Sequence, residues 1–170
     1  GILTLFVIVG ILAPWIVPHE PMQKHYFEDG RLMRLLTPSN DFPLGTTLYA
    51  RDVFSQIIMG TRTALIVGVT TAFAMTIVGL NVGLIAGYFG GWVDSLLMRT
   101  TDVVFGVPLL PFAIVALSLL DRNTWWIITL MALLFWPITA RVVRAQVLSL
   151  RERPFVDAAR ISGADHFRIL

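Results

Sequence analysis

The sequence predicts an all-α fold, a polytopic membrane helical bundle with four transmembrane helices. The first observation is composition: of 170 residues, 56% are hydrophobic and 14% are charged, and the mean hydropathy is +0.75. Water-soluble domains are usually about 45–50% apolar and about 25% charged. The second observation is that four long stretches contain no Asp, Glu, Lys or Arg. The chain also lacks cysteine, which excludes a disulfide framework and a cysteine-ligated metal site.

The four charge-free stretches are close to the length that a bilayer requires. They cover residues 1–19, 63–93, 103–120 and 123–140. A helix needs about 20 mostly apolar residues to cross a hydrocarbon core about 30 Å thick. The alternative for the first stretch is a signal peptide, but it has neither a basic n-region nor a small-x-small cleavage site. For the others the alternative is buried helices of a soluble protein, which four such segments in one short chain disfavour.

Turn and loop residues set the expected order of elements. We expect a first span at 1–17 that is incomplete at its N-terminus, an extracytoplasmic loop at 18–62, a second span at 64–86, a glycine-rich turn at 87–91, a third span at 93–120, a fourth at 125–140 and a polar tail at 141–170. The loop holds several prolines and mixed charge, so it is expected to be mostly irregular. The tail carries six arginines in 30 residues. By the positive-inside rule, residues 141–170 are therefore expected in the cytoplasm.

Small residues recur at four-residue spacing in the second span. Gly79, Gly83 and Gly87 fall on one face of a helix. Such a stripe lets another helix approach closely, so we expect a helix-packing face there. The alternative is that glycine is simply common in membrane helices. Asn81 lies near the stripe, and a helix–helix hydrogen bond and a substrate contact are equally compatible with it.

Other residues of the spans suggest kinks and anchors. Prolines remove a backbone donor, so they are expected to bend or break helices; they are Pro108, Pro111 and Pro137. Tryptophans near the span ends are expected to anchor at the membrane interface; they are Trp92, Trp125, Trp126 and Trp136. Asp94, Arg99 and Asp102 open the third span, and we expect a surface charge network there, with Arg99 in approximate reach of both acids.

Catalytic and ligand-binding motifs do not emerge. The sequence has no G-x-S-x-G and no H-E-x-x-H, and its only lysine, Lys24, is not in a glycine-rich loop, so a Walker A motif is excluded. If the protein uses ATP, another chain must bind it. The histidines, His19, His25 and His166, are not spaced as a metal site, and a net charge of +2 gives no argument for nucleic acid.

The tail has the pattern of a docking element. Pro154 suits the first position of a helix, and Gly163 is expected to end it. Between them an apolar side is expected from Phe155, Val156, Ala158, Ala159 and Ile161, and Phe167 restarts one after the glycine. Asp157 faces away. An exposed apolar face of this kind fits a partner groove, and the alternative is an amphipathic helix lying on the membrane.

Several motifs, in order along the chain, resemble one family. The D-A-A-x-x-x-G run from Asp157 to Gly163 resembles the E-A-A-x-x-x-G loop of binding-protein-dependent ABC importer permeases. Further stretches resemble the dipeptide/oligopeptide/nickel permeases and suggest their C-type subunit; they are Pro43–Thr46, Arg51–Ser55 and Gly60–Arg62, then Gly87–Arg99 and Arg141–Leu150. The sequence departs from the family pattern at Asp157, where Glu is usual, and at Thr47 and Ala50, where Asp and Gly are usual.

The resemblance implies a function and its partners. It implies a six-helix half-pore of the type I importer fold, of which four spans would be present here. Residues 63–170 would be the first part of the permease domain, and the chain would be truncated after Leu170. It implies a second permease subunit, two cytoplasmic ATP-binding subunits that carry ATP and magnesium, and an extracytoplasmic solute-binding protein. It places the chain in a prokaryotic inner membrane. The chain itself would be no enzyme and would hold no cofactor.

The coupling role is also implied by the resemblance. ATP-driven closure of the partner subunits would act on residues 151–170, with docking through Phe155, Val156, Asp157, Ala158, Ala159, Gly163 and Phe167. Cargo would be peptides, or nickel. Two alternatives remain at this point: a subunit of an unrelated exporter or channel whose tail lies on the membrane, and an intramembrane enzyme, for which no catalytic pair is found.

Overall fold

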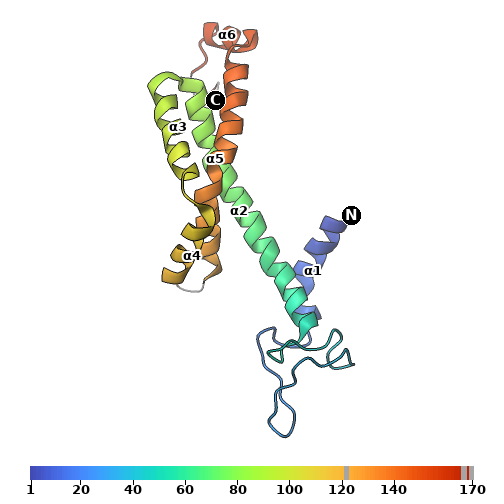
Figure 1. Cartoon of the computed structure of the whole chain (residues 1–170). Coiled ribbons are helices and arrows are strands. Elements are labelled where there is room, and N and C mark those ends of the chain that lie inside the picture. Colours follow the sequence, from blue (N-terminus) through green and yellow to red (C-terminus); the bar gives the residue numbers. More distant parts are fainter. Residues whose placement is uncertain (121–122, 166–167, 169–170) are drawn as a thin grey trace. The chain divides into compact units, whose positions relative to one another are not determined.

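The described part of the chain, residues 1–120, 123–165 and 168, is helical apart from one long loop (Figure 1). The computed structural model contains α1 (Ile2–Ile16), α2 (Val53–Phe89), α3 (Gly91–Phe105), α4 (Leu109–Leu119), α5 (Thr124–Arg151) and α6 (Pro154–Ile161). Among these described residues, β structure is limited to two isolated bridges, both in the loop that precedes α2. The all-α prediction is confirmed. The chain forms two compact units, Gly1–Gly68 and Val69–Leu170.

The apolar helices match a membrane protein, with two differences from the four predicted spans. α2 and α5 are each long and apolar enough to cross a bilayer. The third predicted span is a pair of helices, α3 and α4, bent by 78°. α1 is apolar but has only 15 residues.

Pro108 explains the break between α3 and α4. Gly106 and Val107 close the last turn of α3 with hydrogen bonds to the carbonyls of residues 102–104. Pro108 then stands before α4 in an extended conformation and cannot donate a backbone hydrogen bond. The predicted break is therefore confirmed at Pro108. Pro111 lies in the first turn of α4, where a backbone donor is not needed, and α5 continues through Pro137.

The first unit pairs α1 with the beginning of α2. A Cβ atom on Gly10 would lie 2.5 Å from Leu65 Cδ1 and 3.6 Å from Arg62 Cα, so the two helices pack closely at this glycine. α2 begins at Val53, inside the range predicted for the loop. The reason is the carboxylate of Asp52, which accepts hydrogen bonds from the N–H groups of Phe54 and Ser55 and so caps the helix.

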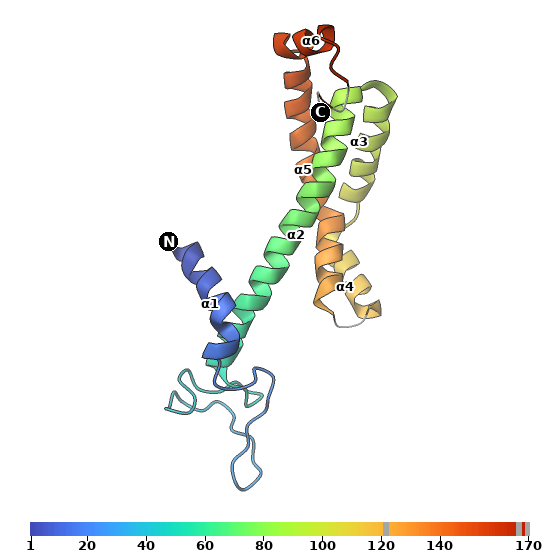
Figure 2. The ribbon, with the colours of Figure 1, turned by 180° about the vertical axis from the view of Figure 1, so that it is seen from behind.

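The second unit is organised by a seam between α2 and α5, which lie side by side (Figures 1 and 2). Each glycine of the stripe meets α5. A Cβ on Gly79 would lie 2.7 Å from the Trp136 carbonyl oxygen, one on Gly83 2.6 Å from that of Ala140, and one on Gly87 2.8 Å from Val147 Cβ. All three glycines are buried. We call these contacts the α2–α5 seam.

Trp136 and Asn81 differ from their expected roles. Trp136 is only 7% exposed and lies in the α2–α5 seam, so the prediction of an interfacial anchor is wrong for this residue. Its carbonyl oxygen contacts Gly79 and its side chain is buried within the bundle, so the ring is not free to anchor at an interface. Asn81 is exposed and donates a hydrogen bond to the Ile77 carbonyl of its own helix at 2.7 Å.

Two ion pairs join α3 to α5. Asp94 accepts two hydrogen bonds from Arg144, and Asp102 pairs with Arg141. The predicted network around Arg99 is therefore wrong about the partners of both acids. Arg99 is exposed, and its spacing of five residues from Asp94 places the two on different sides of a helix.

We expect Gly83→Ala to destabilise the chain. The added methyl would meet the Ala140 backbone, and overpacking of this kind costs about 1–3 kcal/mol. Gly68→Ala, on the same helix, is the matched control because a Cβ there has no atom within 4 Å. Thermal unfolding in detergent, followed by circular dichroism, should give a lower midpoint for Gly83→Ala and an equal or higher one for Gly68→Ala. Equal midpoints for the two variants would contradict the seam.

Candidate functional site

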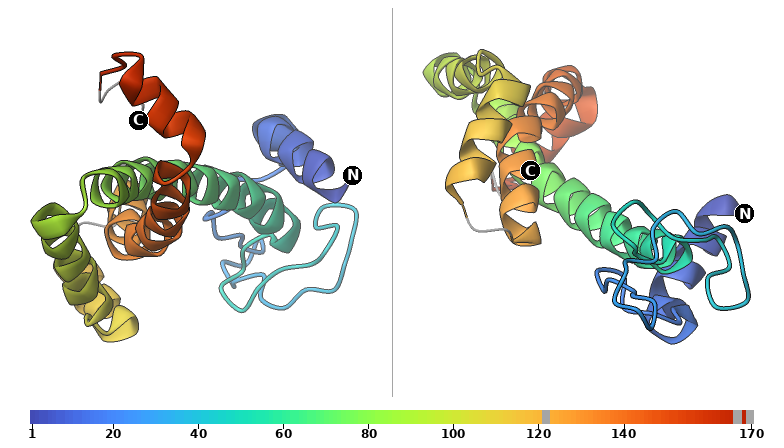
Figure 3. Two further views of the ribbon diagram at one scale, coloured as in Figure 1. Left: turned by 90° about the horizontal axis from the view of Figure 1, so that it is seen from above. Right: turned by 60° about the horizontal axis from the view of Figure 1, so that its bottom comes forward.

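The segment that follows α5 is positioned by a short, well-defined turn. α5 ends at Arg151, and Arg153 N donates to the Leu150 carbonyl at 3.0 Å. Pro154 then opens α6, as predicted, and Val156 N donates to the Arg153 carbonyl at 2.9 Å. α6 lies across the end of α5 and does not continue it (Figure 3). The turn therefore presents α6 as a separate short helix.

α6 has a buried contact and an exposed apolar side. Val156 is 6% exposed and, together with part of Phe155, lines a cavity of about 160 Å³ with residues of α2 and α5 that include Leu84, Tyr88, Val147 and Leu150. Phe155 is 62% exposed and Ile161 is 88% exposed. Val156 thus fixes α6 to the bundle, whereas Phe155 and Ile161 offer apolar surface.

The remaining predicted docking residues are distributed as follows. Asp157 and Ala158 are exposed on α6, and Ala159 belongs to the same helix. Gly163 follows the helix with φ of 79°, a left-handed conformation that favours glycine after a helix end. Phe167 lies outside the residues that the structure describes. α6 therefore brings Phe155 to Ala159 together on one helix.

Arg151 lies where α6, the end of α5 and the end of α2 meet. Its Nη1 donates a hydrogen bond to the Gly87 carbonyl at 3.2 Å. Its side chain also lines a cavity of about 430 Å³ with Tyr88, Glu152 and Asp157. This arginine was not predicted as a site residue, because the contact joins positions 64 residues apart.

The sequence contains a pattern that could have predicted the ion pairs made by the arginines of α5. Arg141 and Arg144 stand at the end of a long apolar stretch, and α3 carries Asp94 in its first turn and Asp102 near its C-terminal end. Charges at membrane depth are expected to pair with one another. Searching for opposite charges on different spans would therefore have suggested the pairs that Asp94 and Asp102 make.

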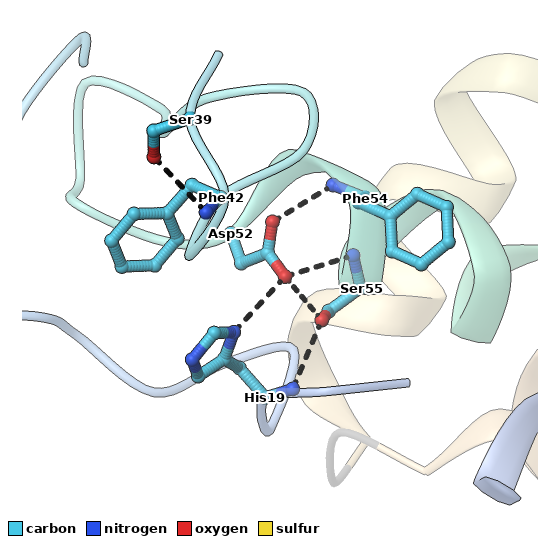
Figure 4. Close-up of polar contacts among 6 residues, drawn as sticks. All are labelled: His19, Ser39, Phe42, Asp52, Phe54 and Ser55. Atoms are coloured by element: carbon cyan, nitrogen blue, oxygen red, sulfur yellow. Dashed lines mark hydrogen bonds and ion pairs between the residues drawn. The ribbon is translucent and has the colours of Figure 1, made fainter. Parts of the chain in front are cut away.

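A second polar cluster lies in the loop, around Asp52 (Figure 4). Asp52 is completely buried, and its Oδ2 accepts hydrogen bonds from Ser55 Oγ and Ser55 N. His19 joins from the other end of the loop: its N–H donates to Ser55 Oγ at 3.3 Å, and its Nδ1 lies 3.3 Å from Asp52 Oδ2. Asp52 thereby ties the start of the loop to the start of α2.

Aromatic rings cover this cluster. The ring of His19 stacks on that of Phe42 with centroids 5.1 Å apart, and His25 packs edge-on against both. His25 Nε2 is buried without a hydrogen-bond partner. In the part of the chain that the structure describes, no three side chains of the metal-binding types converge on a metal site.

The cluster shifts the acidities of two groups. Burial raises the pKa of Asp52, but hydrogen bonds from Ser55, His19 and the backbone outweigh it, so the pKa is lowered overall. Burial and the nearby His19 lower the pKa of His25, against an opposing effect of Asp52. The folded loop therefore favours ionised Asp52 and neutral His25.

The two departures from the family pattern in this loop are accommodated differently. Thr47 Oγ1 accepts hydrogen bonds from the N–H groups of Tyr49 and Arg51, as a short acidic side chain would in such a turn. Ala50 has φ of 58°, in the left-handed region that costs a non-glycine residue about 1–2 kcal/mol. Gly45 also has a positive φ, and a Cβ there would lie 2.2 Å from the Leu36 carbonyl oxygen.

Comparison with known proteins identifies the family. Residues 79–170 match the model of the binding-protein-dependent transport system inner membrane component. The chain belongs to this family. The match covers the α2–α5 seam, both α3–α5 ion pairs and α6, and it confirms the resemblance to importer permeases.

Relatives of this permease family extend the similarity to the loop. The chain is 34% identical over 99% of its length to the dipeptide transport system permease protein DppC of Alkalihalophilus pseudofirmus, and covers 54% of it. It is 32% identical over 98% of its length to the glutathione transport system permease protein GsiD of Pectobacterium atrosepticum, again covering 54%. For DppC of Bacillus subtilis the values are 34%, 99% and 51%. The chain thus spans about half the length of these relatives.

We expect the loop to loosen as pH falls from 7.5 to 5.5. Because the pKa of His25 is lowered on folding, the unfolded loop binds a proton more readily below about pH 6.5. Asp52 does not contribute in this range, since its stabilisation is lost only below its ordinary pKa of about 3.9. His25→Phe should therefore be less sensitive to acid than the unchanged protein.

Hydrogen exchange of residues 18–52 tests this expectation. The comparison is made between variants at each pH, so that the intrinsic pH dependence of exchange cancels. Tyr26→Phe is the control, because it changes a neighbouring exposed ring to the same phenylalanine and leaves His25 in place. The same acid sensitivity in His25→Phe and in the unchanged protein would contradict a role for His25.

Proposed function

We propose that the chain is a transmembrane permease subunit of an ATP-driven, binding-protein-dependent importer that carries peptides. The observation that carries the proposal is α6: a short helix across the end of α5, inside the family-matched region, with Phe155 and Ile161 exposed. An exposed apolar helix on a fixed base is suited to docking by a soluble partner. The names of the relatives, dipeptide and glutathione permeases, support peptides as cargo.

The proposed mechanism is a rigid-body switch driven from outside the chain. Two ATP-binding subunits hold ATP and magnesium, and their closure displaces α6. Val156 joins α6 to the bundle, so its displacement moves α2 and α5 together. With a second permease subunit, the spans would alternate between outward-facing and inward-facing states. An extracytoplasmic solute-binding protein would deliver the peptide.

The proposal places α6 in the cytoplasm and the loop on the other side. Three crossings, namely α2, the α3–α4 pair and α5, separate Tyr49 in the loop from Ile161 in α6. An odd number of crossings places these two residues on opposite sides of the membrane. Both are exposed, at 65% and 88%, and the chain has no native cysteine. We expect an impermeant maleimide to label Tyr49→Cys from outside intact cells and Ile161→Cys only in inverted vesicles. Labelling of both from one side would refute this topology.

We expect Ala158→Glu to weaken docking of the ATPase and so to reduce peptide uptake. Ala158 is exposed on α6, and a larger charged side chain there would prevent close docking. In the reconstituted transporter, the unchanged subunit should co-purify with the ATPase, whereas the variant should retain little of it. The rate of peptide uptake should fall at least about tenfold, because loss of a hot-spot contact costs more than about 1.4 kcal/mol.

Ala145→Glu is the matched control, because Ala145 is an exposed alanine on α5. It should keep ATPase binding and uptake. Normal uptake with Ala158→Glu would contradict docking through α6, whereas an unchanged subunit that bound no ATPase and gave no uptake would favour an exporter or channel whose tail lies on the membrane. In that case α6 should bind lipid vesicles in place of a soluble ATPase.

A further inference from the structure

Arg151 occupies the end of the α2–α5 seam. It follows Val147 by four residues and so lies on the same face of α5 as the valine that covers Gly87. We propose that Arg151 is a positioning residue that links α6 to the turn between α2 and α3, so that a displacement of α6 reaches these helices as well as α5. The inference rests on the proposed function, because it assigns a route to the coupling motion.

The first observation is the hydrogen bond to the end of α2. Arg151 Nη1 donates to the Gly87 carbonyl at 3.2 Å, and Gly87 belongs to the last turn of that helix. Carbonyls of a last turn have no partner within the helix, and the helix dipole makes this end attractive to a cation. The guanidinium thus supplies both a donor and a positive charge where α2 needs them.

The second observation is the shape of the following turn. Gly90 has φ of 65° and ψ of −159°, a conformation open essentially only to glycine. A Cβ atom at Gly90 would lie 2.9 Å from Arg151 Nη1. The backbone of the turn therefore passes close to the guanidinium because the residue there lacks a side chain. The contact involves the turn itself as well as the Gly87 carbonyl of α2.

The third observation is the position of Arg151 relative to α6. α6 is joined covalently to α5 through Glu152 and Arg153 alone. Arg151 shares one cavity with Asp157 of α6 and with Tyr88 of α2. The arginine therefore stands between the first turn of α6 and the end of α2. Its hydrogen bond gives a polar connection to α2 beside the apolar one that Val156 makes.

The test measures coupling in the transporter reconstituted with its ATPase and binding protein. Arg151→Ala should still assemble with the ATPase and hydrolyse ATP, but uptake per ATP hydrolysed should fall about fivefold or more, the lower range of coupling between sites. Arg151→Lys keeps the charge and one donor, and it should recover at least half of the ratio. Arg99→Ala, a change at an exposed arginine of α3, is the matched control and should leave the ratio unchanged.

A local measurement decides the contact without transport. Trp92 and Ser162 are exposed, so cysteines placed there can carry spin labels in a chain without native cysteine. Double electron–electron resonance on the assembled transporter should give a narrow distance distribution that broadens with Arg151→Ala and stays narrow with Arg99→Ala. If Arg151→Ala does not accumulate in the membrane, Arg151→Gln, neutral and of similar size, replaces it in both measurements.

The outcomes separate the two proposals. An unchanged uptake-to-hydrolysis ratio together with an unchanged distance distribution in the neutral variants overturns the positioning role and leaves the importer proposal intact. Absence of ATP-dependent uptake by the unchanged transporter overturns the importer proposal, and the route assigned to Arg151 falls with it. A fall in the ratio that Arg151→Lys does not recover at all also overturns the inference, because a general packing defect would explain it.

Discussion

The close approach of α2 and α5 is the constraint on which the second unit depends. In a bilayer, apolar side chains gain little by leaving lipid for protein, so helices associate through van der Waals contact and polar links. The glycines at 79, 83 and 87 allow the α5 backbone to reach α2. This contact fixes the rotation of α5. It thereby decides that Arg144 faces Asp94 on α3 and that Arg151 reaches the end of α2.

Polar groups stabilise the two units in different ways. In the loop, the buried carboxylate of Asp52 forms hydrogen bonds with groups at both ends of a segment more than thirty residues long. These bonds hold the loop closed without regular secondary structure. In the bundle, charges of opposite sign link helices that are already packed. The Asp52 cluster thus closes a loop, whereas Asp94 and Arg144 set how one helix is rotated against another.

The sequence predicted features that depend on local chemistry. Apolar stretches, the break at Pro108, the helix start at Pro154 and the small-residue face of α2 all follow from residue type and short spacing. Pairings between distant residues were not predictable in this way. Arg99 was the nearest cation to Asp94 along the chain, yet α5 supplies the partner. Trp136 resembles an interface anchor until the position of α2 is known.

The bend between α3 and α4 has an electrostatic consequence. A straight helix cancels its peptide dipoles internally and leaves partial charges only at its two ends. Because α3 and α4 meet at 78°, the negative end of one and the positive end of the other no longer cancel. In the topology proposed above, where the α3–α4 pair is one crossing, these partial charges would lie within the thickness of the bilayer, where a low dielectric constant screens them weakly. A charged solute that passes this level would meet a field that an unbroken span does not produce.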